Sequence, residues 1–137
     1  MQASMTPSAP DSGVQFMNDI AAAFPGAARV IRARRQEERG DLLPHMEMSD
    51  LIWWAGETYA SSQSLDESSR RARRELEDFM RMLEDRFEVG DQDVDNLIAV
   101  SFLEGLAQTR ESLPGLRRLL GPRMLAWYRK ACEGDET

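Results

Sequence analysis

The sequence predicts an all-α protein, a single compact domain of six or seven helices with no sheet. Apolar residues recur at the spacing of one helical face along most of the 137 residues. β-branched residues are sparse beside Leu, Ala, Met, Arg and Glu, and no Asn-Gly or Asp-Gly pair marks a hairpin. Because a chain of this length suits one domain, we expect the helices to share one core.

The predicted elements of the first half are a mobile tail over 1–12 and helices over 13–24, 26–39 and 49–62. The tail is rich in Pro and Ser and contains little that can pack. In the first helix Phe16, Ile20 and Phe24 share one face, and the Pro25-Gly26 pair ends it. Ser49 is a suitable N-cap for the third helix.

The second half is predicted to form helices over 66–88, 92–108, 113–120 and 122–132, followed by a frayed acidic end over 133–137. The helical domain therefore spans 13–132. The clearest apolar stripe consists of Leu76, Phe79, Met80, Leu83 and Phe87. Asp66 or Ser64 can cap that helix, Gly90 suits its C-terminal end, and Asp91 can cap the next one. The run LIAVSFLEGL is apolar on nearly every side, which is typical of a helix surrounded by others.

Composition excludes several classes of protein. The single cysteine, Cys132, excludes an internal disulfide framework and a Cys-based zinc cluster, and the single histidine, His45, excludes sites that need two histidines. No stretch is long and apolar enough to span a membrane, and residues 1–12 lack the features of a secretory signal. We therefore expect a cytoplasmic protein. The net charge of −7 disfavours binding to nucleic acid or to an anionic membrane and permits a basic partner.

The segment Asp91–Asp95 begins like a calcium-binding loop, with Asp at alternate positions. Such a loop needs Gly at its sixth position and Glu at its twelfth. This chain has Asn96 and Phe102 there. We therefore interpret the segment as an acidic helix N-terminus and expect no metal or cofactor.

Three further residues are candidates for chemistry, and each has a structural interpretation that we favour. Glu104 lies in the apolar run, where a buried carboxylate would accept bonds from backbone amides or an arginine. We expect His45, beside Pro44, to be a hydrogen-bonded loop residue, and Cys132 to be a half-buried thiol. No other acid, His or Cys accompanies Glu104 in its segment, so the sequence favours a protein that is not an enzyme.

Charge is concentrated in residues 75–95, where nine acids accompany two arginines. On the outermost line of the predicted helix, Arg74, Asp78, Arg81 and Asp85 alternate in sign and can pair within the helix. A charged run is often only a solvated face, and the alternative is a surface complementary to a basic partner. The predicted partner contacts are Glu77, Glu84, Glu88, Asp91 and Asp93, with Trp53 or Trp54 as an apolar anchor.

Several short motifs carry a family resemblance. They are LLPHME from Leu42, a helix with Phe79, Leu83 and Phe87, a Gly90-Asp91 turn, NLI and VSFLE from Asn96, and LLGP from Leu119. The chain resembles a family of small bacterial helical proteins of unassigned domain type, over about 40–125. Many members of that family resemble immunity proteins encoded beside polymorphic or contact-dependent toxins.

The resemblance implies a non-enzymatic immunity protein that binds one cognate toxin domain stoichiometrically and blocks its active site or its substrate surface. An acidic inhibitor suits a toxin with a basic cleft, such as a nuclease or a nucleotide-using enzyme. The alternative is a helical adaptor or secretion chaperone, which would bind a segment of an effector. The sequence leaves open whether the protein is a monomer or a homodimer, and whether its basic and acidic segments meet in a self-complementary dimer.

Overall fold

The computed structural model describes residues 12–135, which form helices and no strand. The helices are α1 (Ser12–Ala23), α2 (Pro25–Glu37), α3 (Pro44–Ser61), α4 (Glu67–Arg86), α5 (Gln92–Asn96), a π-helical segment (Leu97–Glu104), α6 (Gly105–Gln108), a 3₁₀ turn (Leu116–Leu119) and α7 (Pro122–Asp135). The predicted all-α single domain is thus confirmed. Of the predicted tail, residues 1–11 lie outside the described part of the chain, as do 136 and 137 of the acidic end.

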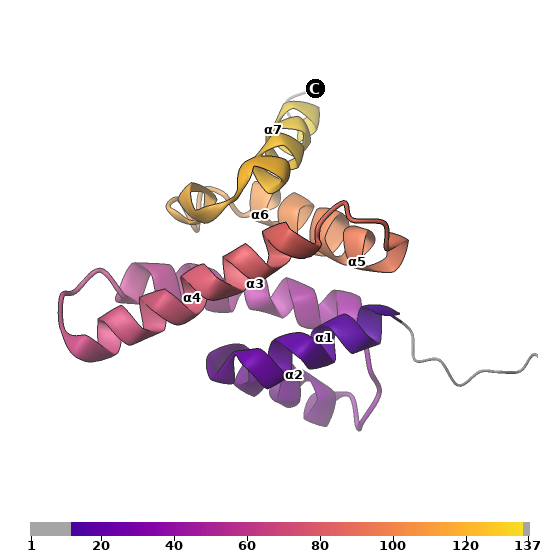
Figure 1. Ribbon diagram of the computed structural model, residues 1–137, viewed down its shortest axis with the longest axis horizontal. Coiled ribbons are helices and arrows are strands. Elements are labelled where there is room, and N and C mark those ends of the chain that lie inside the picture. The colour runs from indigo at the N-terminus through magenta and orange to yellow at the C-terminus, as the bar shows by residue number, and fades with distance from the viewer. Residues whose placement is uncertain (1–11, 136–137) are drawn as a thin grey trace, which may run out of the picture.

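The helices stack in three levels (Figure 1). The pair α1 and α2 forms one side, α3 and α4 cross the middle, and α5, α6 and α7 form the other side. Helix α3 contacts α1, α2, α4, α6 and the π-helical segment. The longest predicted stretch between breaks, 92–108, is one continuous helical run made of α5, the π-helical segment and α6, and we call it the central helix.

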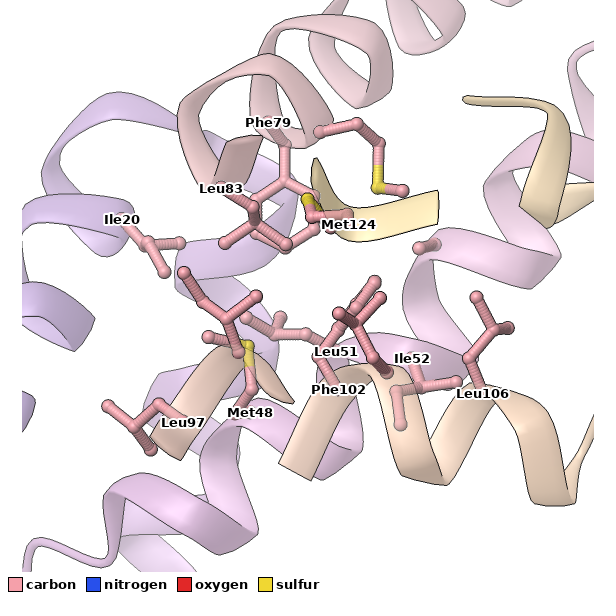
Figure 2. Packing of buried hydrophobic residues seen from close by; sticks show 14 of the residues in the cluster. Ile20, Met48, Leu51, Ile52, Phe79, Leu83, Leu97, Phe102, Leu106 and Met124 are labelled. Atoms are coloured by element: carbon pink, nitrogen blue, oxygen red, sulfur yellow. The ribbon is translucent and has the colours of Figure 1, made fainter. Parts of the chain in front are cut away.

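One hydrophobic core joins the three levels (Figure 2). Every residue of the apolar stripe predicted on α4 is buried, and Figure 2 shows Phe79 and Leu83 of that stripe near Met124 of α7. The central helix supplies Phe102, which is fully buried as its apolar run predicts. Gly105 lets α3 approach closely, because a Cβ there would lie 2.6 Å from Ile52 Cδ1.

Several predicted boundaries are wrong by a few residues. Helix α3 begins at Pro44 rather than Ser49, because proline already has the φ of a first helical position and lacks the N–H that would be unsatisfied there. Helix α7 continues to Asp135 rather than ending at 132. The predicted helix over 113–120 is reduced to the 3₁₀ turn, and Ser12 belongs to α1 rather than to the tail.

A buried carboxylate joins α2 to α3, and it is not the one that the sequence indicated. Glu47 is fully buried and accepts two bonds from Arg35, at 2.9 and 3.1 Å. One turn away Arg34 forms a second bidentate pair with Asp50, at 2.7 and 2.8 Å. Glu104, which we expected to be buried, is partly exposed, because the central helix lies at the edge of the stack and leaves one side uncovered.

Candidate functional site

The acidic residues at the junction of α4 and α5 form a compact group, which we call the acidic corner: Glu88, Asp91, Asp93 and Asp95. Asp91 Oδ1 caps α5 by accepting from the backbone N–H groups of Asp93 and Val94, at 3.1 and 3.2 Å. The Ser12 hydroxyl lies 3.0 Å from Asp91 Oδ1 and 3.1 Å from Asp93 Oδ2. Asp95 Oδ1 accepts from the Glu88 N–H at 2.7 Å. The first residue of α1 and a backbone amide thus hold the carboxylates in place.

The turn that leads into the acidic corner is unusual in its backbone. Helix α4 ends at Arg86, two residues earlier than predicted, and Glu88 has a φ of 63°. This left-handed conformation is costly for a residue with a Cβ, and the bond from the Glu88 N–H to Asp95 compensates for it. Gly90, which we expected to end the helix, has a φ of 109° within the turn. Val89 between them is 58% exposed, so an apolar side chain protrudes beside the carboxylates.

Hydrogen bonds from the Val94 N–H and the Ser12 hydroxyl lower the pKa of Asp91 below its ordinary value of 3.8. A depressed carboxylate pKa adds stability above the pKa of the unfolded chain, and that stability is lost as the pH falls below it. Asp91→Asn keeps a capping oxygen but removes the charge. We therefore expect wild type to exceed this variant in stability near neutral pH, and the difference to shrink below about pH 4. Urea unfolding across pH measures it, and a difference that did not vary with pH would contradict the assignment.

Glu84, a predicted partner contact, has its carboxylate occupied within the molecule. Its side chain is only 13% exposed. Its two oxygens accept from the backbone N–H groups of Arg123 and Met124, both at 3.0 Å, at the beginning of α7. Gly121 just before α7 has no side chain to cap it, and a Cβ there would lie 2.5 Å from Glu84 Cδ. Glu84 therefore caps α7 from α4, in a space that glycine leaves open.

Glu84→Ala is expected to lower the free energy of unfolding by about 2–3 kcal/mol, because two helix amides lose a charged acceptor. Exchange protection of the Arg123 and Met124 amides should fall more than that of α4 amides. Asp85→Ala is the matched control, since Asp85 is the exposed neighbour, and we expect it to change stability by less than about 0.5 kcal/mol. Equal effects of the two substitutions in urea unfolding would exclude the capping role.

The remaining predicted carboxylate, Glu77, lies apart from the acidic corner. It is exposed and forms an ion pair with Arg73 at 3.4 Å. About 13 Å of helix separates it from Arg86 at the end of α4. Of the five predicted carboxylates, the structure thus brings Glu88, Asp91 and Asp93 together, directs Glu84 inward and places Glu77 more than two turns away.

The two tryptophans have different surroundings. Trp54 packs edge-to-face on Phe79, with ring centroids 5.3 Å apart. Trp53 is 47% exposed and borders an apolar groove of about 600 Å³, together with Tyr59, Leu113 and Leu116. Only Trp53 is therefore accessible as an anchor, and the groove-lining residues include none of the predicted carboxylates. The sequence did not indicate this groove, because its walls come from α3 and from the segment around the 3₁₀ turn.

His45 and Cys132 have partners within the fold. His45 lies in the first turn of α3, rather than in the loop that we expected, and its Nδ1 is hydrogen-bonded to the Ser101 hydroxyl. Cys132 is half-buried, as predicted, and burial together with the neighbouring Cys132 raises the pKa of Tyr128. No group of three or more potential metal ligands occurs in the described part of the chain. Nor does any helix within 12–135 have the length and apolarity needed to cross a membrane.

Comparison with known proteins adds a family to this geometry. A family model described as a domain of unknown function, DUF7674, matches residues 17–134. The chain belongs to the DUF7674 family. That match covers every helix except the ends of α1 and α7, which agrees with the unassigned domain type that the motifs indicated. The searches of the curated proteins and of the solved structures found no match.

Proposed function

We propose that this DUF7674 protein is an immunity protein, which binds a cognate toxin domain through the acidic corner and blocks it stoichiometrically. The observation that carries the proposal is the arrangement of that corner. Its carboxylates are held by amides and a hydroxyl, and the exposed Val89 lies among them. The family resemblance noted in the sequence supports the same interpretation.

The physical chemistry of the acidic corner suits a basic, folded partner. Hydrogen-bonded carboxylates are already oriented, so binding them costs little side-chain entropy. Their negative field accelerates the encounter with a positively charged surface. An apolar side chain at the centre, surrounded by polar groups, matches the usual anatomy of a protein interface. With a standard buried area of about 1,600 Å², such a surface can reach nanomolar affinity.

The first test is protection of a susceptible bacterium. The product of the adjacent upstream gene is expressed alone and together with this protein, and the cells are examined for rescue and for a co-purifying one-to-one complex. We expect rescue with a stable complex. A harmless neighbouring product, or a complex without rescue, would contradict the proposal.

Charge reversal then locates the binding face. Glu88→Lys with Asp93→Lys is expected to slow association by about tenfold or more at low salt and to have less effect at high salt. Glu111→Lys, an exposed acid outside the corner, is the matched control. Glu84 is unsuitable for this test because its reversal would disturb the start of α7. Unchanged association of the double variant would exclude the acidic corner as the contact surface.

The groove beside Trp53 favours a second candidate function, that of an adaptor or secretion chaperone. Its size and aromatic walls suit a short apolar segment of an effector protein. In that case Trp53→Ala would weaken binding of the effector about tenfold or more, and reversal of the acidic corner would have little effect. The opposite pattern is expected of an immunity protein, so the two sets of variants distinguish the two functions.

A further inference from the structure

The outer face of α4 carries a continuous stripe of exposed charges. Six positions spaced alternately by three and four residues form it, and all six side chains are exposed: Arg71, Arg74, Asp78, Arg81, Asp85 and Glu88. This spacing keeps residues on one line along a helix. In Figure 1 α4 runs across the front of the molecule with α3 behind it, and no other helix covers it. We call this line the α4 stripe.

The order of signs in the α4 stripe opposes the needs of the helix itself. Helices favour acidic residues in the first turns and basic residues in the last. Here the arginines Arg71 and Arg74 are near the beginning, whereas Asp85 is near the end. Within residues 12–135, neither Arg74 nor Asp85 forms an ion pair, although Arg81 pairs with Asp78 at 2.8 Å. The arrangement therefore contributes little to the stability of a single copy.

The same order is complementary to itself when a second α4 is laid antiparallel. With the symmetry axis between Phe79 and Met80, Arg74 faces Asp85 of the second copy. Asp78 then faces Arg81, and Arg71 faces Glu88. Every layer joins opposite charges, and the two-fold axis repeats each layer, so three kinds of pair give six contacts. Antiparallel helices also place opposite dipole ends together.

We propose that the α4 stripe is the contact surface of a two-fold symmetric homodimer, in which two α4 helices lie antiparallel. Such an interface is isologous, because each copy contributes the same surface. It consists of exposed ion pairs, which are individually weak and are screened by salt. The dimer is therefore a low-affinity, salt-sensitive one. This proposal does not depend on the immunity function, and its test needs no toxin.

The test is a charge swap followed by sedimentation equilibrium of the full chain. Wild type is expected to dimerise at about 20 mM salt, and its dissociation constant should rise about tenfold or more at about 500 mM. Arg74→Glu places two acids opposite each other in both symmetry-related layers, and Asp85→Arg does the same with two bases. Each single variant should be monomeric. The double variant R74E/D85R restores opposite charges and should dimerise like wild type.

Controls separate loss of the dimer from loss of the fold. Each single variant brings the helix charges closer to the order that the dipole favours, so thermal unfolding of the monomer should occur no lower than in wild type. Arg32→Glu, at an exposed site on α2, should leave dimerisation unchanged. A wild-type protein that stays monomeric at low salt and millimolar concentration would overturn the proposal. So would a dimer that persists in both single variants or is not restored by the swap.

Discussion

Arg35→Ala is expected to lower the free energy of unfolding by about 3–5 kcal/mol, the largest effect of any charge removal that we predict. The substitution leaves Glu47 fully buried without the two hydrogen bonds that its carboxylate accepts from Arg35. An isolated buried charge cannot be compensated by water. Urea unfolding at neutral pH measures the loss.

The cost of this substitution should be asymmetric between the two partners. Glu47→Gln leaves Arg35, whose side chain is 23% exposed and can turn toward water, so we expect a smaller loss. Replacing both residues, by Arg35→Met with Glu47→Leu, should bring stability close to wild type, because apolar side chains of similar volume need no partner. If Arg35→Ala cost less than about 1 kcal/mol, water would have to reach Glu47 and the pair would not be a buried one.

Phe79→Ala is expected to cost about 3–5 kcal/mol, because it opens a cavity at the centre of the core. The Phe79 ring contacts three other rings edge-to-face: Phe24 at 5.8 Å, Trp54 at 5.3 Å and Phe102 at 6.0 Å between centroids. These rings belong to different parts of the fold, so one side chain holds α3, α4 and the central helix together. The loss should appear in urea unfolding, with increased mobility of the Trp54 ring in NMR spectra.

Two variants serve as controls for Phe79→Ala. Phe79→Leu keeps most of the volume and should cost less than the alanine substitution. Val100→Ala removes an apolar side chain that is 48% exposed on the central helix, and it should change stability by less than about 0.5 kcal/mol. A loss of similar size at both positions would mean that Phe79 is not the centre of the core.

Residues whose partners are close in sequence were predictable. Asp66 accepts from the Ser69 N–H at 2.9 Å, and Asp91 caps α5 in the same way, because a cap needs only the next turn of its own helix. The stripe of α4 and the apolar run of the central helix were also readable, since periodicity specifies which face is buried. The candidate site was predictable only in part: the sequence located the acidic corner but misplaced Glu84 and left Trp53 and Trp54 undistinguished.

The sequence by itself therefore determined the helical class, the order of the helices, most of the core and the acidic character of one corner, because each depends on spacing along the chain. The tertiary structure alone decided which carboxylates are free to bind. Glu84 is 39 residues from Arg123 and Glu47 is 12 from Arg35, and no local pattern encodes either pairing. Burial of a charge is decided by the side chains that the fold brings around it, and these come from separate helices.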